Sequence, residues 1–397
     1  MLPKGMARRI TLDFLKTEAA SGVILALAAA LAIGLANSPG SEFYFSFIKH
    51  PLTLQVGPFE ETKTVLKWVK DGLMAVFFFV VGLEIKFEIL RGELSNPRKL
   101  ALPVLAALGG MVVPALVYAG LNSGPGGAPE GWPVPVATDI AFALAALAIA
   151  GPRLPASLRT FLLTLAIADD LGAVGLIAAL FTGHFDLVPL ALAGAGLALM
   201  ALAGLWRRTP LAVYGLLFVL VWAMTLKSGL NTSLAGVAAA MTIPIGARRP
   251  GEEGVLRQVM HTLHPYVAYG IMPLFAFVAA GFSASALSLD SLFSPVTLGV
   301  ALGLFLGKQV GVFGASALAI GLKLARRPTG ASWLDVYGCA LLCGVGFTMS
   351  LYIGALAFSA DNPTAQGQVQ MGVIAGSLLS ILAGMACLAW SQRRRPI

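Results

Sequence analysis

The chain has 397 residues, of which 57% are hydrophobic and 12% are charged, and its mean hydropathy is +0.84. This composition excludes an ordinary soluble domain, in which about 25% of the residues are charged. The net charge of +8 comes from basic residues at the ends of apolar segments rather than on one face of a folded unit, so nucleic acid is not expected as a partner. We therefore predict one integral membrane domain over residues 1–397.

Apolar segments long enough to cross a bilayer follow one another along the chain. We predict twelve spanning helices, at 15–36, 65–90, 99–120, 132–150, 156–180, 187–206, 210–226, 229–246, 256–283, 296–319, 334–358 and 366–390. Basic residues precede the first and follow the last, so the positive-inside rule predicts that both termini are cytoplasmic. Cys339, Cys343 and Cys387 fall in predicted spans and are interpreted as packing residues rather than as disulfide or metal-binding residues.

The connection at residues 38–61 separates the first two spans. Its Phe/Tyr/Ile run and its Leu/Val run are divided by the sequence Lys-His-Pro, a pattern that predicts a short extracytoplasmic β-hairpin. An exposed hairpin edge carries unpaired backbone groups, so we expect this segment to pair with a second copy of the chain.

The fourth span, 132–150, is interrupted near its start. Pro133 and Pro135 remove backbone donors, and Thr138 and Asp139 follow where the freed carbonyl groups need partners. Two interpretations of Asp139 are compatible. It caps the second half of the helix, and its carboxylate neutralises the positive helix ends at the break.

The eleventh span, 334–358, contains Gly344 and Gly346, which permit an unwound stretch before Thr348 and Ser350. One interrupted helix in each half of the chain is the pattern of inverted-repeat transporters, which bind their substrates near the middle of the membrane. The predicted fold class is thus an all-α polytopic membrane protein with inverted repeats, two interrupted helices and a short β-hairpin.

Two adjacent carboxylates, Asp169 and Asp170, lie about halfway along the apolar segment 156–180. A charged carboxylate at this depth costs about 2.5 to 3.5 kcal/mol, so such residues mark an ion or proton pathway. The alternative is a pair of neutral carboxylic acids hydrogen-bonded between helices. Lys308 is a cation deep in the tenth span, which either extends to the interface or pairs with a buried carboxylate, and we favour the pair.

These residue types suit a small monovalent cation. Carboxylates, the Thr138 hydroxyl and unwound backbone carbonyls are oxygen ligands of the kind that hard cations prefer. The same carboxylates bind protons, so protonation and cation binding compete at one site. Competition at a site with alternating access produces exchange of a cation for protons. No organic cofactor is expected.

The residues that carry this chemistry lie in segments that resemble the bacterial NhaA-type sodium/proton antiporters, in order and along nearly the whole chain. The matching segments are "DGLMAVFFFVVGLEIKFE" (71–88), "VATDIAFALA" (136–145), "LAIADDLGA" (165–173), "LKSGLNTSLAGV" (226–237), "HPYVAYGIMPLFAF" (264–277), "GLFLGKQVG" (303–311) and "CGVGFTMSLYIGALAF" (343–358).

The resemblance implies a transporter rather than an enzyme. It implies twelve helices, with the fourth and eleventh unwound and crossing, in the bacterial inner membrane. The expected partners are membrane lipid and a second copy, in a homodimer joined through 38–61. The implied activity is electrogenic exchange of intracellular Na+ or Li+ for protons, two protons for each cation, in sodium and pH homeostasis.

The resemblance also assigns roles to individual residues. Asp170 resembles the principal carboxylate for the cation and the proton, and Asp169 the neighbour that alternates between the ion and Lys308. Asp139 and Thr138 resemble the residues at the crossing. Thr348 resembles the matching residue of the eleventh helix, and Asp71 a supporting acidic residue in the second helix.

Three positions depart from the family pattern. Phe87 stands where the family has an arginine, Met260 where it has a glutamate and Asn231 where it has a histidine. The remaining candidates for a pH response are Glu84, Lys86, Glu88 and His264. We therefore expect the ion site to be intact and the pH response to be altered.

Two other functions deserve comparison with antiport. Intramembrane proteolysis uses two aspartates that face each other from different helices, which Asp169 and Asp170 cannot do readily from adjacent positions. A sodium-coupled uptake carrier for an organic solute can share the interrupted-helix architecture. It needs additional buried polar residues to orient the solute, and the sequence has no such surplus.

Overall fold

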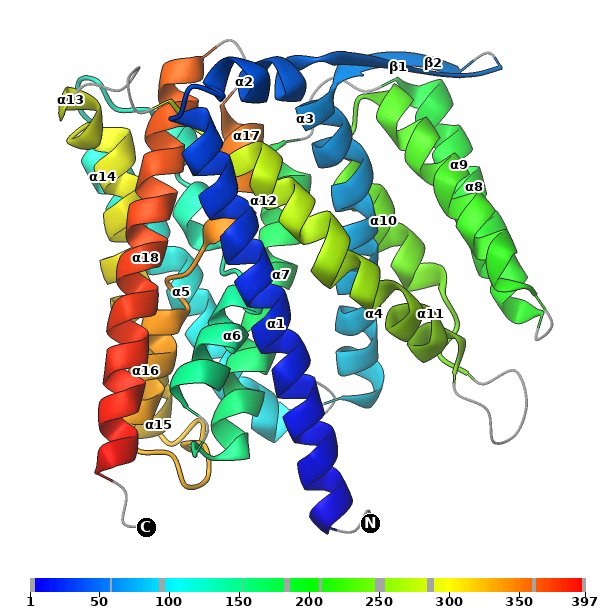
Figure 1. Ribbon diagram of the computed structural model, residues 1–397. Coiled ribbons are helices and arrows are strands. Elements are labelled where there is room, and N and C mark those ends of the chain that lie inside the picture. Colours follow the sequence, from blue (N-terminus) through cyan, green and yellow to red (C-terminus); the bar gives the residue numbers. More distant parts are fainter. Residues whose placement is uncertain are drawn as a thin grey trace. The chain divides into compact units, whose positions relative to one another are not determined.

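The structure, a computed structural model, describes residues 4–57, 59–92, 97–151, 153–181, 186–206, 209–246, 254–283, 289–358 and 362–394. The chain divides into two compact units, each made of segments that are separate in the sequence. Figure 1 colours the chain from the N-terminus (blue) to the C-terminus (red), so each unit contains several colours. Unit 1 consists of Met1–Ile33, Asn96–Ala173 and Phe282–Ile397, and unit 2 consists of Gly34–Ser95 and Val174–Gly281.

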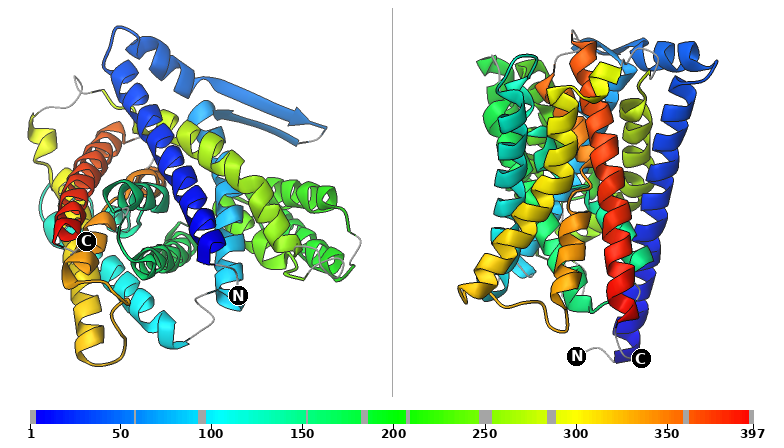
Figure 2. Two further views of the ribbon diagram at one scale, coloured as in Figure 1. Left: turned by 60° about the horizontal axis from the view of Figure 1, so that its bottom comes forward. Right: turned by 90° about the vertical axis from the view of Figure 1, so that its left-hand side faces the viewer.

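The regular elements in the described part of unit 1 are all helices, and the unit contains both interrupted helices. Helix α18 packs against α14 and α16, as Figures 1 and 2 show, and α5 packs against the π-helical segments η7 and η8. The elements assigned to this unit, some of which extend beyond it, are α1 (Lys4–Ala36), α5 (Pro97–Asn122), η3 (Pro129–Gly131), η4 (Val134–Val136), α6 (Ile140–Ala150), α7 (Ala156–Leu180), α13 (Leu289–Leu292), α14 (Pro295–Leu302), η7 (Gly303–Gly307), η8 (Gln309–Phe313), α15 (Gly314–Gly321), α16 (Trp333–Leu342), α17 (Phe347–Ala357) and α18 (Pro363–Arg393).

Unit 2 combines helices with one two-stranded sheet. Helices α8 and α9 lie side by side, and α10 packs along α4. Its elements are α2 (Ser41–Lys49), β1 (Pro51–Val56), β2 (Phe59–Thr64), α3 (Val65–Trp68), η1 (Val69–Leu73), α4 (Met74–Arg91), α8 (Leu187–Leu205), α9 (Leu211–Ser228), α10 (Thr232–Thr242), α11 (Val255–Tyr266), η5 (Val267–Ile271) and α12 (Met272–Ala280).

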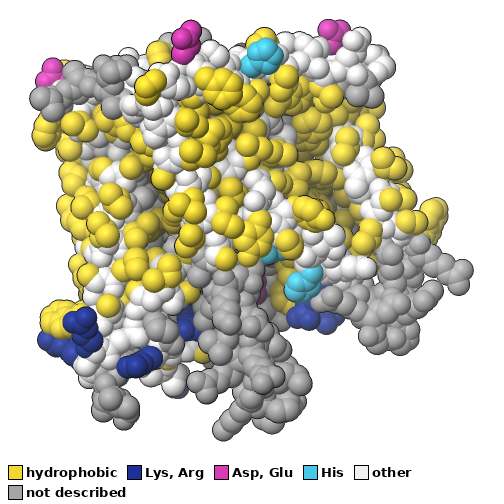
Figure 3. Space-filling view, viewed as in Figure 1, with side chains coloured by type: hydrophobic (Ala, Val, Ile, Leu, Met, Phe, Trp, Pro, Cys, Tyr) yellow, Lys and Arg dark blue, Asp and Glu magenta, His cyan; other side chains and the backbone are white. Residues whose placement is uncertain are grey.

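The helices have the length and composition of membrane spans. Within the described ranges, seven helices are long and apolar enough to cross a bilayer, and the number reaches ten when each of three bent helix pairs counts as one span. Hydrophobic side chains cover most of the exposed helix surface in Figure 3, and the charged side chains in view lie toward helix ends. The helices agree with a multi-pass membrane protein, while a total of twelve spans stays a prediction.

The predicted hairpin at 38–61 is wrong in its first half. Residues Ser41–Lys49 form helix α2, because Tyr44 and Ile48 lie one turn apart and are both buried. The Tyr44 hydroxyl donates a hydrogen bond to the carbonyl of Phe277 at 2.7 Å, which fixes this helix face within unit 2. The strands follow the helix and pair in antiparallel register from Pro51 opposite Thr64 to Val56 opposite Phe59. Residue 58, at their turn, lies outside the described residues.

The helix expected at 229–246 is shorter than predicted. The Asn231 side chain accepts a hydrogen bond from the Ser233 N–H and caps the start of α10. The helix ends before Ile243 because Pro244 disfavours helical backbone at the preceding residue.

Candidate ion-binding site

The two interrupted helices meet at their breaks within unit 1. Segments Pro129–Val136 and Ile140–Ala150 are bent by 41°, and Trp333–Leu342 and Phe347–Ala357 by 42°. The Thr138 hydroxyl donates to the carbonyl of Cys343 at 2.8 Å, and the Asp139 N–H donates to the carbonyl of Val345 at 2.6 Å. Donors at the break of the fourth span therefore form hydrogen bonds with backbone carbonyls at the break of the eleventh span.

Asp139 lies at the start of two half-helices. Its Oδ1 accepts a hydrogen bond from the Phe142 N–H at 3.3 Å, at the start of α6. Its Oδ2 accepts from the Thr348 N–H at 3.0 Å and also from the Thr348 hydroxyl, near the start of α17. Helix N-termini carry partial positive charge, so this buried carboxylate compensates both of them. The capping interpretation and the electrostatic interpretation thus describe the same contacts.

Lys308 lies between the π-helical segments η7 and η8, and its side chain is fully buried. Its ammonium nitrogen is 2.8 Å from Oδ2 of Asp169 and 3.0 Å from the Thr138 hydroxyl oxygen. The ammonium group of Lys308 therefore links α7 to the break before α6. π-Helical turns are frequent at functional sites, because they shift side chains out of the regular helical register.

Glycines allow Lys308 to reach this position. Gly307 packs directly against the backbone of Pro114 in α5, and Gly311 packs against the backbone of Gly109. A side chain at Gly110 would come within 3.8 Å of the ammonium nitrogen of Lys308 and would collide with Val312. This close helix approach is characteristic of small residues in membrane interfaces, and it places the lysine directly beside α5.

Asp169 and Asp170 are 0% and 3% exposed, at successive positions on α7. Asp169 uses Oδ2 for Lys308, and its Oδ1 has no hydrogen-bond partner among the described residues. With Asp139, the site therefore contains three buried carboxylates and one buried ammonium group, that of Lys308. Two excess negative charges result if all four groups are ionised, and protons or a cation can balance them.

Three buried serines belong to the helices around the eleventh span, and of these only Ser350 was expected from the sequence, whereas Ser377 and Ser380 of α18 were not. The hydroxyls of Ser350, Ser377 and Ser380 are buried and have no hydrogen-bond partner in the described part of the chain. The Ser380 hydroxyl lies against Gly344, and that of Ser350 lies against Gly346. Small hydroxyl residues are common in membrane helices, so the sequence carried no signal that separated Ser377 and Ser380 from packing residues.

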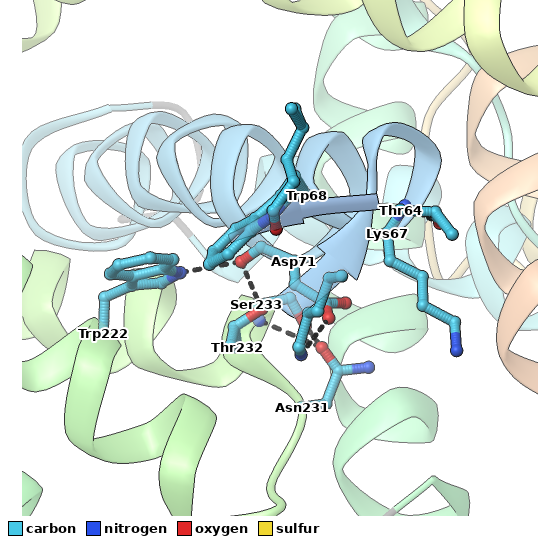
Figure 4. A network of polar contacts seen from close by, with 10 residues as sticks. Thr64, Lys67, Trp68, Asp71, Trp222, Asn231, Thr232 and Ser233 are labelled. Carbon is cyan, nitrogen blue, oxygen red and sulfur yellow. Dashed lines mark hydrogen bonds and ion pairs between the residues drawn. The ribbon is translucent and has the colours of Figure 1, made fainter. Parts of the chain in front are cut away.

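Asp71 belongs to unit 2, where it joins several elements (Figure 4). Its carboxylate is 2.7 Å from the ammonium of Lys63, which belongs to strand β2, and both side chains are partly exposed. Its carbonyl accepts hydrogen bonds from the Trp222 indole at 2.7 Å and from the Thr232 hydroxyl at 2.6 Å. Asn231, where the resemblance implies a histidine, caps α10 immediately beside Thr232.

The candidates for a pH response also lie in unit 2. Lys86 donates to the carbonyls of Met241 and Ile243, each at 2.6 Å, so its ammonium satisfies the last carbonyls of α10. Glu84 and Glu88 lie on α4 with Lys86, and His264 lies on α11.

Two of the three residues at which the resemblance implies a different side chain have apolar surroundings. Phe87 and Met260 both pack against the hydrophobic cluster that contains Leu83 and Leu256. The guanidinium of Arg257 lies 4.6 Å from the centre of the Phe87 ring, within the range of a cation–π interaction. Apolar packing therefore surrounds Phe87, at the position where the resemblance implies an arginine.

Comparison with known proteins identifies the family. The model of a family described as Na+/H+ antiporter 1 matches residues 12–388. The Na(+)/H(+) antiporter NhaA of Rhodospirillum rubrum is 50% identical over 394 residues, which cover 98% of this chain and 99% of that protein. Antiporters of the same name from Bordetella parapertussis (48% identity, covering 94% of this chain and 95% of the relative) and from Syntrophotalea carbinolica (46%, covering 97% of each) are similar along nearly their full length. These names denote transporters rather than enzymes. The chain is a multi-pass membrane protein that belongs to the NhaA family of Na+/H+ antiporters.

Proposed function

We propose that this antiporter exchanges intracellular Na+ or Li+ for external protons at the paired aspartates Asp169 and Asp170. The observation that carries the proposal is the fully buried contact between Asp169 and Lys308, at 2.8 Å, next to Asp170 and to the crossing at Asp139. Charged groups of this kind are expensive inside a membrane protein and are characteristic of ion pathways.

In the proposed chemistry, a sodium ion and protons compete for the same carboxylate oxygens. A sodium ion takes carboxylate oxygens from Asp170 and Asp169 and the hydroxyl oxygen of Thr138, since hard cations prefer oxygen ligands. Asp169 then exchanges its contact with Lys308 for one with the ion. Binding of one cation displaces two protons from Asp169, Asp170 and Lys308 taken together. The cycle therefore moves one net charge and is electrogenic.

Alternating access carries the site from one side of the membrane to the other. We assign the chain twelve spans in two inverted repeats, each of which contributes one interrupted helix, and a single antiport domain over 1–397. Both termini are cytoplasmic and the membrane is the bacterial inner membrane, in keeping with the basic residues before the first span and after the last. Sodium leaves the cell at the expense of the proton gradient, which serves sodium and pH homeostasis.

In this proposal two copies of the chain form a homodimer through residues 38–61. Membrane lipid surrounds the dimer. Strands β1 and β2 form a two-stranded sheet in unit 2, and an exposed edge of such a sheet can pair with the same edge of a second copy. The test is a Gln55→Cys variant in a chain without its native cysteines, oxidised in the membrane. A disulfide-linked dimer supports this partner, and a cross-link that forms no faster than that of a cysteine placed at exposed Trp206 contradicts it.

The exchange itself is tested in proteoliposomes with an acidic interior and a pH-sensitive dye. External Na+ should discharge the pH gradient and external K+ should not. A gradient that persists in Na+ contradicts the proposal. The same vesicles separate antiport from sodium-coupled uptake of an organic solute, because uptake needs a labelled solute to accumulate and antiport does not.

A further inference from the structure

The last turn of α18 contacts the outer ends of both half-helices that lead away from the crossing. Helix α6 begins at the Asp139 cap and ends at Ala150, and α16 begins at the Ser332 cap and ends before Cys343. Each therefore has one end at the crossing and one end beside α18, with which both pack (Figures 1 and 2).

Gln392 holds the end of α6. Its side-chain amide donates to the carbonyl of Ala150, the last residue of that helix, and its side-chain oxygen accepts from the Arg153 N–H at 3.2 Å. The Ala150 carbonyl belongs to the last turn of α6 and the Arg153 N–H lies just beyond it, so both are backbone groups that lack regular helical partners. One half-buried side chain thus replaces the missing partners and fixes the end of α6 to α18.

Ser391, one residue earlier, holds the start of α16. Its hydroxyl donates to Oδ1 of Asp335 at 2.6 Å, and Oδ2 of the same carboxylate accepts from the Ser332 N–H at 2.6 Å. The Asp335 side chain is fully buried, and with Ser332 it forms the capping box of α16. The hydroxyl oxygens of Ser332 and Ser391 are 3.5 Å apart.

We propose that Ser391 and Gln392 are positioning residues of the antiport reaction, which fix α6 and α16 to α18 as one rigid body. An α-helix of 10 or 11 residues transmits displacement along its axis, so the position of its outer end sets the position of its end at the crossing. The groups positioned in this way are Asp139 and Thr138, directly before the start of α6, and the carbonyl of Cys343, directly after the end of α16. The contacts at α18 persist throughout the exchange cycle. This inference rests on the proposed ion-binding site and assigns a positioning role to two residues that lie away from it.

The first experiment compares the apparent KM for Na+ in proteoliposomes of the parent, Gln392→Ala, Ser391→Ala and Ser391→Thr. The two alanine variants should raise KM by about 2- to 30-fold, the range of couplings carried through packed elements. Ser391→Thr keeps the hydroxyl and should restore the parent KM. The matched control is Trp390→Ala, which removes an exposed side chain beside Ser391 on the same helix end and should leave KM unchanged. Parent-like KM values in both alanine variants overturn the proposal.

The second experiment links Ser332→Cys to Ser391→Cys by oxidation, in a chain whose three native cysteines are replaced by alanine. The two hydroxyls are close enough for a disulfide to form after a small adjustment of the side chains. The oxidised protein should exchange Na+ at the rate of the reduced protein. Loss of exchange that reductant restores overturns the proposal, because it means that the helix ends must separate. Failure to cross-link overturns it as well. If the parent itself shows no exchange, the proposed function fails, and the cross-link still tests the contact.

Discussion

Lys308 and Asp169 form an ion pair of 2.8 Å with both side chains fully buried, on segments 139 residues apart in the sequence. Two charges removed from water in this way stabilise each other only while both are present. The pair therefore ties the fold of unit 1 to the charge state of the site.

Replacement of Lys308 by alanine should lower the stability strongly. It leaves the Asp169 carboxylate buried without its cation, a loss of about 3 to 5 kcal/mol in comparable cases. Lys63→Ala is the matched control, because its ion pair with Asp71 is partly exposed and should contribute less than about 1 kcal/mol. Thermal melts of the two purified variants measure the difference. Equal melting temperatures would count against the buried pair.

Asp169→Asn should stop sodium-driven proton movement and leave the protein folded in the membrane. The amide has nearly the same volume, and its oxygen can still accept a hydrogen bond from Lys308, but it neither carries charge nor exchanges a proton. The measurement is the dye assay beside size-exclusion chromatography of the same preparation. Exchange at the parent rate would exclude Asp169 from the ion-binding role.

Thr348→Ala should weaken the crossing, because it removes the hydroxyl that donates to Asp139 and keeps the N–H that also donates. The expected loss is about 1.5 to 3 kcal/mol, as for other hydrogen bonds to charged groups. Thr348→Ser retains the hydroxyl and should melt close to the parent. A serine variant that melts as low as the alanine variant would show that the methyl group, rather than the hydrogen bond, is responsible.

Exchange should increase as the pH rises, with a shallow profile. At low pH the site carboxylates hold protons and exclude sodium, so the apparent affinity for sodium should fall by about tenfold per pH unit for each competing proton. The maximal rate at saturating sodium should vary little, since Phe87, Met260 and Asn231 stand where the resemblance implies three titratable groups. The measurement is exchange at limiting and at saturating sodium across a pH series. An abrupt loss of the maximal rate within one pH unit would reveal a separate gate, with Glu84, Glu88 and His264 as its first candidates.

The positions of most of the described helices and of both breaks could be predicted from the sequence because their signals are local. An apolar run has the length of a bilayer, and proline or glycine marks where a helix is interrupted. Helix α2 could not be predicted in this way, because its Phe/Tyr/Ile run has high strand propensity and the buried spacing of Tyr44 and Ile48 is short. Burial against Phe277, far along the chain, decides the outcome.

The sequence predicts the carboxylates and Lys308 as candidate site residues because a charge in an apolar segment is conspicuous, and the buried contact between Lys308 and Asp169 agrees with the predicted pairing. The hydrogen-bond partners that position the site could not be predicted. The bond from Thr138 to the Cys343 carbonyl joins residues 205 positions apart, and that from Gln392 to Ala150 joins residues 242 positions apart. A backbone carbonyl leaves no mark in the sequence that distinguishes it from any other.

The most direct test of the account is the sodium-driven pH change in proteoliposomes that contain Asp170→Asn. The parent should discharge an acidic interior on addition of Na+, and the variant should give no more signal than empty vesicles, while it remains folded by thermal melt. Asp170 is 3% exposed, so its replacement by the nearly isosteric asparagine changes the charge and the proton with little change in volume. Robust exchange by Asp170→Asn would contradict the assignment of the ion-binding site.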